Sequence, residues 1–286
     1  MRPQWLNPAA YPFKAYWFPA ASKRLHYLDE GKGPAIVMLH GLGTWSYLFR
    51  NQIKELMADH RCLVPDLPGH GFSDSSQKPL NWDKELDMLS DWIETKLPER
   101  FILIGHDTGG LFAQHLAARF AERLDALVLV NSWAWPITEQ KNIRRQSFWY
   151  RNALGRWWQA RSNSLLKGAF RDKALREAKP DYLAHFSDRA SRVAIAERFA
   201  ATRSSADFFA TPKLTHHIPT LILEGGQDRF RSKDSSVRWG EKIPYARYQS
   251  LAHAGHYLPE ESDPFFLQQL RTFLKSIHTP SSNSHA

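Results

Sequence analysis

The sequence predicts an α/β fold in which a mostly parallel central sheet is flanked by helices and carries an inserted helical lid. Short apolar runs typical of buried strands alternate with longer segments of helical periodicity, as in a parallel sheet covered by helices. Several of these runs end directly in glycine-containing turns. Between 134 and 212 the alternation stops, and the sequence becomes helical and rich in aromatic residues and arginine. We interpret this segment as a helical insertion between two strands.

The apolar runs and the periodic segments give the order of the elements. The expected strands are 36–39, 61–64, 101–104, 127–130, 220–223 and the region around 245–248. The expected helices, in which apolar residues recur at helical spacing, are 45–57, 82–97, 111–120 and 262–276. These elements divide the chain into an α/β core of 1–133 and 213–278, a helical lid of 134–212, and a polar tail of 279–286 that we expect to be disordered.

Composition excludes several classes of protein. The chain has 286 residues, of which 43% are hydrophobic and 23% are charged, as in globular proteins. Its single cysteine, Cys62, excludes an intramolecular disulfide and cysteine-based metal sites, and we expect neither a metal nor an organic cofactor. The apolar runs are too short to cross a membrane, and the first residues lack the apolar core of a signal peptide, so we expect a cytoplasmic location.

The positive charge is concentrated in one segment. The formal net charge is +9, and the segment from Lys141 to Arg176 holds ten basic residues and one acid, Asp172, so it accounts for the whole surplus. The sequence has neither zinc-knuckle spacing nor an RNA-recognition motif, so we expect no nucleic-acid partner. Two interpretations stay open. The segment is either an ordinary solvated helix face, or a basic, tryptophan-rich surface that makes weak contact with a membrane or attracts an anionic substrate.

The main functional signal is the segment 105–110, Gly-His-Asp-Thr-Gly-Gly, between an expected strand and an expected helix. It has the form of a nucleophile elbow, in which flanking glycines permit a sharp turn that exposes the central side chain at the carboxyl end of the sheet. Serine is the usual central residue, but here it is Asp107. An aspartate can also cap a helix, but the strand, the glycines and the helix together favour a nucleophile.

An aspartate nucleophile limits the chemistry. A carboxylate can displace a leaving group from a saturated carbon and form an ester with the enzyme. Water must then attack the carbonyl carbon of that ester, which requires a general base and an oxyanion hole. We expect His256 to be the base, with His253 as the rival, and Asp228 to orient the imidazole, because Asp228 follows an expected strand. The backbone N–H groups of Leu42 and Thr108 are the expected oxyanion hole.

At this point the sequence resembles the α/β-hydrolase superfamily, and within it the branch of haloalkane dehalogenases and epoxide hydrolases, which uses aspartate in the elbow. The segment 40–50, His-Gly-Leu-Gly-Thr-Trp-Ser-Tyr-Leu-Phe-Arg, is similar to the dehalogenase pattern HG-x-P-TWSYLYR. The segment 66–74, Asp-Leu-Pro-Gly-His-Gly-Phe-Ser-Asp, resembles the loop D-x-x-G-x-G-x-S-D that follows it. The resemblance implies the chain order nucleophile, acid, histidine, and it supports His256 through the histidine loop around it.

The sequence departs from the dehalogenase pattern at three positions. Thr108 stands where dehalogenases usually carry a tryptophan that holds the halide, Leu42 stands where many carry a halide-binding asparagine, and Gly43 replaces a proline. Some relatives carry the third catalytic acid at the position of Asn131. Aromatic residues in and near the insertion remain candidates for contact with the leaving group or substrate, namely Trp133, Trp135, Trp149, Trp157, Trp158 and Tyr150.

The sequence therefore predicts a hydrolase with a covalent aspartyl-ester intermediate, which cleaves a carbon–halogen bond in a small apolar electrophile and uses water as co-substrate. One alternative is an epoxide hydrolase, for which Tyr150 and Tyr182 would be the candidate proton donors. The other is a hydrolase-derived protein that binds a small apolar ligand, although a complete triad argues against a pure receptor.

Overall fold

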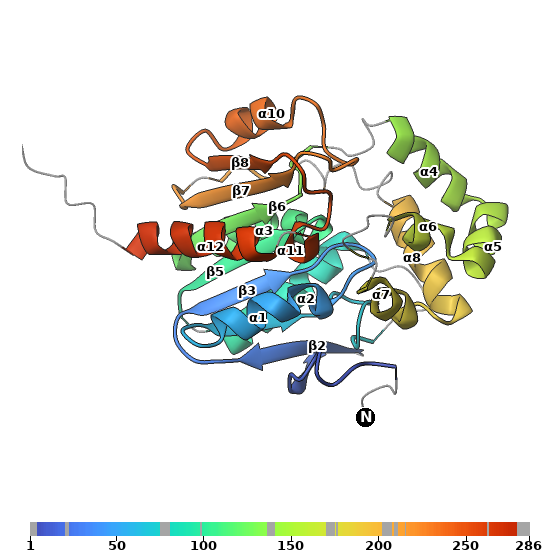
Figure 1. The fold of residues 1–286 in the computed structure, drawn as a ribbon, viewed down its shortest axis with the longest axis horizontal. Helices are drawn as coiled ribbons and strands as arrows, with labels where there is room; N and C mark the ends of the chain where they lie inside the picture. Colours follow the sequence, from blue (N-terminus) through green and yellow to red (C-terminus); the bar gives the residue numbers. More distant parts are fainter. Residues whose placement is uncertain are drawn as a thin grey trace, which may run out of the picture.

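A single sheet forms the centre of the molecule. The computed structural model describes residues 5–20, 23–74, 81–97, 99–135, 141–169, 175, 177–201, 208, 211–214, 216–261 and 263–278. The strands are β1 (Ala15–Ala20), β2 (Lys23–Glu30), β3 (Ala35–Leu39), β4 (Arg61–Pro65), β5 (Phe101–His106), β6 (Leu124–Val130), β7 (Thr220–Gly225) and β8 (Arg247–Leu251). They form an eight-stranded sheet in the order β1-β2-β4-β3-β5-β6-β7-β8 (Figure 1). The pairs β1–β2 and β2–β4 are antiparallel, and all the others are parallel.

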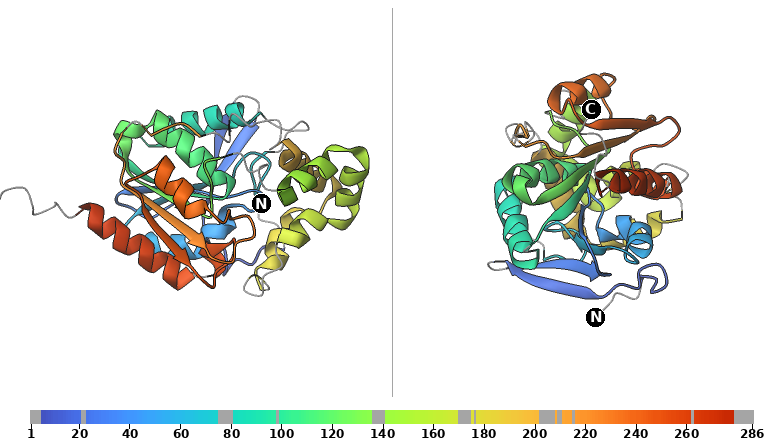
Figure 2. Two further views of the ribbon diagram at one scale, coloured as in Figure 1. Left: turned by 90° about the horizontal axis from the view of Figure 1, so that it is seen from above. Right: turned by 90° about the vertical axis from the view of Figure 1, so that its left-hand side faces the viewer.

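Helices cover both faces of the sheet. The helices outside the insertion are η1 (Ser46–Phe49), α1 (Arg50–Leu56), α2 (Trp82–Lys96), α3 (Thr108–Arg119), η2 (Ala121–Arg123), α10 (Ser235–Lys242), α11 (Leu258–Glu261) and α12 (Asp263–His278). Helices α2 and α3 lie on one face of the sheet, and α1 and α12 lie on the other (Figure 2). The two helix layers exclude water from both faces, as parallel strands require.

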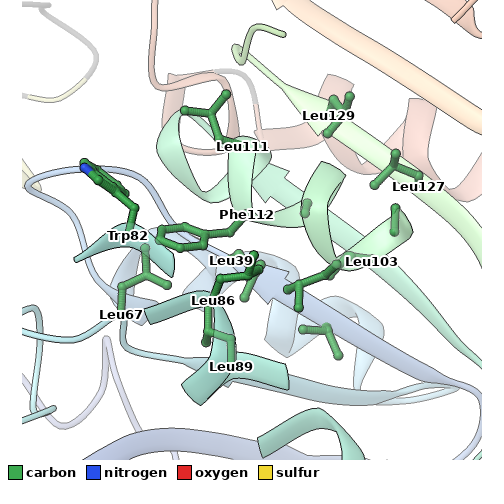
Figure 3. Packing of buried hydrophobic residues seen from close by; sticks show 14 of the residues in the cluster. Leu39, Leu67, Trp82, Leu86, Leu89, Leu103, Leu111, Phe112, Leu127 and Leu129 are labelled. Carbon is green, nitrogen blue, oxygen red and sulfur yellow. The ribbon is translucent and has the colours of Figure 1, made fainter. Parts of the chain in front are cut away.

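The central strands are apolar throughout because side chains on both faces are buried. In β5, Leu103 belongs to the cluster on the side of α2 and α3, whereas Ile102 and Ile104 belong to the cluster on the opposite face. Figure 3 shows the first cluster, which includes Leu103 of β5 and Phe112 of α3. Each of these side chains is fully buried, which contributes roughly 1.5–3 kcal/mol apiece. This packing fixes the carboxyl end of β5, where the elbow begins.

Five described helices lie between β6 and β7. They are α4 (Lys141–Arg151), α5 (Ala153–Ser162), α6 (Ser164–Ala169), α7 (Lys179–His185) and α8 (Arg189–Ala201). We call them the helical insertion. They form a separate layer beyond one end of the sheet, on the right in Figure 1. The insertion is tied to the core by the buried ion pair of Arg198 with Glu85, and by the Tyr182 hydroxyl, which donates to Glu260 at 2.9 Å.

The structure contains every expected strand and helix, with one division and, outside the insertion, five additions, of which η2 and α11 are single short turns. The expected helix 45–57 is divided into η1 and α1. The antiparallel strands β1 and β2 and the helix α10 were not predicted, because their short sequences mix exposed polar residues with apolar ones and lack a sustained period. The expected tail 279–286 lies outside the described residues. Among the described residues, no helix could span a membrane and no cluster could hold a metal ion.

Candidate active site

Asp107 sits at a strained turn between β5 and α3. Its backbone has φ 53° and ψ −123°, a conformation that costs energy for a residue with a side chain. The turn closes because its neighbours are small: a Cβ on Gly105 would collide with the backbone of Gly109 and Gly110, and a Cβ on Gly41 would collide with the Asp107 side chain. The strain and the glycines together are what a nucleophile elbow requires.

The two carboxylate oxygens of Asp107 have different surroundings. Oδ2 accepts a hydrogen bond of 2.8 Å from the backbone N–H of Leu42, and the Thr108 amide also donates to this carboxylate. Oδ1 lies 3.5 Å from Nε2 of His256. Oδ2 therefore accepts from one of the two expected oxyanion donors, and Oδ1 faces the imidazole.

Asp228 holds the far side of the imidazole. Nδ1 of His256 lies 2.9 Å from Oδ2 of Asp228. The same Oδ2 accepts a hydrogen bond of 2.8 Å from the side-chain amide of Asn131, and Oδ1 accepts one of 2.8 Å from the backbone of Phe230. Asp107, His256 and Asp228 are thus arranged in one chain of contacts, and each of them is buried.

The charges in this chain depend on one another. Burial alone would lower the pKa of His256, but the Asp228 charge and the hydrogen bonds with Asp107 and Asp228 raise it to about 10. Burial would raise the pKa of Asp107 and of Asp228, but the hydrogen bonds and the charge of His256 hold both below their ordinary values. At neutral pH the site therefore contains an imidazolium between two carboxylates.

Two neighbouring side chains hold the backbone of the site. The Ser132 hydroxyl donates to the backbone carbonyl of Asp107 at 2.9 Å. Nε2 of His106 lies 2.8 Å from the carbonyl oxygen of His256, so the ring donates through this nitrogen. Burial lowers the pKa of His106 to about 4, and the ring is neutral at pH 7. These bonds tie the elbow to β6 and to the histidine loop.

The chain of contacts opens on a small apolar cavity of about 60 Å³. The residues of the core that line the cavity are Leu42, Asp107, Thr108, Trp133, Phe230, His256 and Tyr257. The described lining residues of the insertion are Ile143 of α4, Leu165 and Leu166 of α6, and Ile195 and Phe199 of α8. Such a site suits a small apolar molecule whose reactive end reaches the carboxylate.

The aromatic candidates occupy different places. Trp133 lines the cavity, and its buried indole N–H has no hydrogen-bond partner among the described residues. Trp149 of α4 and Trp157 of α5 are exposed, so both side chains lie on the outside of the insertion. Tyr150 is buried, but its hydroxyl lies 3.3 Å from Ser164 Oγ, and the residue is not part of the cavity lining.

The remaining candidates also lie away from the cavity. Trp135 packs against Trp239, and Trp158 is exposed. His253, the rival of His256, is exposed on the loop after β8. The structure thus places Asp107, His256, Asp228, Leu42 and Thr108 together as expected.

Asn131 is the residue whose contribution the sequence did not reveal. The position of Asn131 carries an acid in some relatives. Here the side-chain amide of Asn131 donates to Asp228 and so holds that carboxylate toward His256. It lies at the turn after β6 with φ 45°, a conformation that asparagine tolerates better than most residues. Its place directly after an apolar strand was the signal that could have identified it.

Comparison with known proteins agrees with this geometry. Residues 34–263 match the model of the alpha/beta hydrolase fold family. The chain is 29% identical over 290 residues to a Shewanella oneidensis protein named cis-3-alkyl-4-alkyloxetan-2-one decarboxylase, covering 94% of this chain and 90% of that protein. It is 27% identical over 281 residues to haloalkane dehalogenase 2 of Mycobacterium tuberculosis, covering 90% of this chain and 93% of that one.

Solved structures show the same fold. The haloalkane dehalogenase DatA from Agrobacterium tumefaciens C58 superimposes with a TM-score of 0.85 at 21% identity, covering 95% of this chain and 100% of that chain. The epoxide hydrolase CorEH superimposes with a TM-score of 0.80 at 20% identity, covering 93% and 100%. The chain therefore belongs to the alpha/beta hydrolase fold family.

Proposed function

We propose that this protein is a dehalogenase-like hydrolase that cleaves a carbon–halogen bond through an ester on Asp107. The observation that carries the proposal is the placement of the Asp107 carboxylate, with Oδ2 bound by the Leu42 amide and Oδ1 beside His256 at the apolar cavity. A carboxylate so placed can attack a saturated carbon, and the groups needed to hydrolyse the resulting ester lie around it.

In the first step, Oδ1 of Asp107 attacks the carbon that bears the halogen. The new C–O bond forms as the carbon–halogen bond breaks, and the halide leaves with the bonding electrons. The apolar cavity favours this step because an unsolvated carboxylate is a stronger nucleophile than a hydrated one. The product is an uncharged alkyl ester of Asp107.

Ester formation prepares His256 for the second step. The Asp107 charge, which helps to raise the pKa of His256, disappears when the ester forms, so the imidazolium can release its proton. The neutral imidazole then takes a proton from water, which attacks Cγ of Asp107. The negative charge develops on Oδ2, where the amides of Leu42 and Thr108 stabilise it. As this intermediate collapses, the bond between Cγ and the alkyl oxygen breaks, and the His256 imidazolium protonates the departing oxygen to give the alcohol. The proton left on the Asp107 carboxyl passes to His256, which restores the carboxylate.

Trp133 is our candidate for the group that holds the halide. Leu42 contributes no side-chain donor, whereas the Trp133 indole N–H is buried at the cavity without a partner among the described residues. A buried N–H without a partner costs roughly 1–3 kcal/mol, which a bound leaving group would relieve.

We also treat the helical insertion as a lid. Its apolar side chains, such as Ile143 and Phe199, close the side of the cavity opposite Asp107 and exclude bulk water from the reaction. In this proposal the lid comprises 134–212 and the core comprises 1–133 and 213–278.

The named Shewanella relative favours a second candidate substrate, an oxetan-2-one, which is a four-membered lactone. Asp107 would attack the saturated ring carbon that bears the ring oxygen, the bond between that carbon and the ring oxygen would break, and the ring carboxylate would be the leaving group. Loss of carbon dioxide would then form the carbon–carbon double bond as the Asp107 carboxylate departs. This sequence of steps consumes no water, and Trp133 would hold the emerging carboxylate. The epoxide alternative has less support, because the hydroxyls of Tyr150 and Tyr182 are engaged by Ser164 and Glu260.

One experiment separates these routes. The enzyme, in excess, is incubated in oxygen-18 water with a bromoalkane, an epoxide or a dialkyl oxetan-2-one, and the peptide carrying Asp107 is analysed by mass spectrometry. Dehalogenation predicts bromide, alcohol and label in Asp107, and an oxetan-2-one predicts alkene and carbon dioxide without label. Diol with label would assign the epoxide route. Turnover of the bromoalkane that leaves Asp107 unlabelled contradicts the proposal, and tight binding without any turnover would favour a receptor.

A further inference from the structure

The outer surface of the helical insertion combines exposed apolar and basic side chains. Phe148 is 61% exposed, Trp149 41%, Leu154 59%, Trp157 44% and Trp158 50%. Exposed basic residues lie among them. We call the exposed basic and large apolar residues of these two helices the α4–α5 outer face, which consists of Arg144, Arg145, Phe148, Trp149, Arg151, Leu154, Trp157, Trp158 and Arg161.

The spacing of these residues makes each helix amphipathic. In α5, Leu154, Trp157, Trp158 and Arg161 recur at intervals of three and four residues, so they share one side of the helix. The opposite sides of α4 and α5 pack against α8. Figure 2 shows these helices at the end of the molecule farthest from α12, so that their outer sides are accessible. On each of the two helices, which also contact each other, the apolar and basic side chains therefore share one outer side.

We propose that the α4–α5 outer face binds to the surface of an anionic phospholipid bilayer. Surface-lying helices of this kind present tryptophan, phenylalanine and leucine to the acyl chains and arginine to the headgroup phosphates. The segment 141–171 contains no aspartate or glutamate, so its charge is complementary to an anionic membrane. The Arg161 guanidinium lies 4.9 Å from the centre of the Trp157 ring, which keeps cation and indole together at the depth of the headgroups.

The same features disfavour other occupants. Two copies of the chain would bring like charges together if this face paired with itself, which is destabilising. Nucleic acid would be matched by the charge, but it offers no apolar phase for exposed Leu154 and Phe148. A membrane satisfies both the arginines and the apolar side chains.

The proposed position of the membrane agrees with the cavity. Ile143, on the inner side of α4, lines the cavity, while Arg144 and Phe148 on the same helix belong to the outer face. Binding would bring the apolar cavity within one helix diameter of the bilayer, about 10 Å, where apolar substrates accumulate. The proposal does not depend on which bond the enzyme cleaves.

The test is sedimentation of the full-length protein with sucrose-loaded vesicles. Vesicles of phosphatidylcholine alone are compared with vesicles that contain about one quarter phosphatidylglycerol. We expect at least about tenfold stronger partitioning to the anionic vesicles, and loss of most of that difference in about 0.5 M sodium chloride. The intrinsic tryptophan fluorescence should be quenched by brominated acyl chains in the anionic vesicles only.

Variants identify the surface. Arg144→Glu/Arg145→Glu should weaken partitioning by about 30-fold or more, since each cation near the membrane contributes about fivefold. Trp157→Ser/Trp158→Ser should weaken it by about tenfold or more and remove part of the quenching. The control Lys32→Glu/Lys54→Glu changes the charge equally at exposed sites outside the insertion and should stay within about twofold of the parent. Asp107→Asn should bind vesicles as the parent does.

Three results would overturn the proposal. The first is equal partitioning to both kinds of vesicle. The second is an equal loss in the control variant, which would indicate a nonspecific effect of net charge. The third is a dimer of the parent protein that the arginine or tryptophan variants abolish without vesicles, which would assign the face to a second copy of the chain.

Discussion

The core wall of the cavity carries the reactive and charged groups, whereas the wall from the helical insertion is built from aliphatic and aromatic side chains. In the core, three of the polar groups follow strands, Asp107 after β5, Asn131 after β6 and Asp228 shortly after β7, and His256 lies on the loop after β8. The insertion packs over these ends without any polar contact to Asp107 in the described residues. We infer that the core determines which bond reacts and the insertion determines which molecule fits.

Removing the nucleophile should have the largest effect. Asp107→Asn retains the shape and the strained turn but lacks an anionic oxygen, so we expect kcat/KM to fall by about 10⁵-fold or more. Freshly purified variant is assayed on the best substrate, and its intact mass confirms that the amide has not hydrolysed. Trp135→Phe, at a site in the packed core away from the cavity, serves as the control. Activity above one tenth of the parent would show that the core wall does not act through Asp107.

Loss of the base should arrest the reaction after the first step. In His256→Gln, Asp107 can still attack, but nothing activates water, so we expect steady-state turnover to fall by about 10³- to 10⁴-fold. A bromoalkane should release one halide per enzyme in a burst, and the intact mass should rise by the alkyl group. His253→Gln, at the exposed neighbouring histidine, should retain the parent rate. Absence of both burst and mass shift would contradict the ester intermediate.

The acid of the triad should have a smaller effect that is partly recoverable. Asp228→Asn removes the charge that holds Nδ1 of His256, and we expect a loss of about 10³-fold in kcat. Because Asn131 donates to Asp228 at 2.8 Å, the double variant Asn131→Asp/Asp228→Asn exchanges acid and amide within one hydrogen-bonded pair. We expect it to recover about tenfold of the lost rate. A double variant less active than Asp228→Asn would show that the acid can orient His256 only from the loop after β7.

The sequence predicted the core far better than the insertion, for physical reasons. A strand buried on both faces must be apolar, so 101–104 is recognisable from composition alone, and the elbow is recognisable because the backbone there demands glycine. The insertion has no comparable constraint. Which of its helix faces meets the cavity depends on packing between distant helices, so Ile143 and Phe199 were missed while exposed Trp149 was proposed. Trp133 was a candidate because it lies near the entry to the insertion, and in the structure it lines the cavity three residues after β6.

The interaction of His256 with Asp107 and Asp228 predicts how the stability of the protein depends on pH. Asp107 and Asp228 raise the pKa of His256 to about 10, so protonated His256 stabilises the fold fully below its ordinary pKa near 6.5, and this contribution is lost as the pH rises toward 10. We expect the unfolding temperature to fall over this range, and to fall less in Asp107→Asn, which lacks one of the two charges. Imidazole NMR signals should show a lower pKa for His256 in the variant. An unchanged pKa would mean that Asp107 and His256 do not interact.

The smallest effect is expected at the insertion wall, and there it should change selectivity and not chemistry. Leu165 of α6 lines the cavity and is only half-buried, so Leu165→Ala enlarges the cavity at moderate cost to stability. We expect kcat/KM for a substrate one or two methylenes longer to rise relative to the short substrate by about tenfold, because each methylene in an apolar pocket contributes about 1–3 kcal/mol. The matched control is Leu154→Ala, on the outer side of α5, which should leave the ratio unchanged. If Leu165→Ala instead abolished the burst on all substrates, the insertion would take part in the chemistry, and the division between the two walls would be wrong.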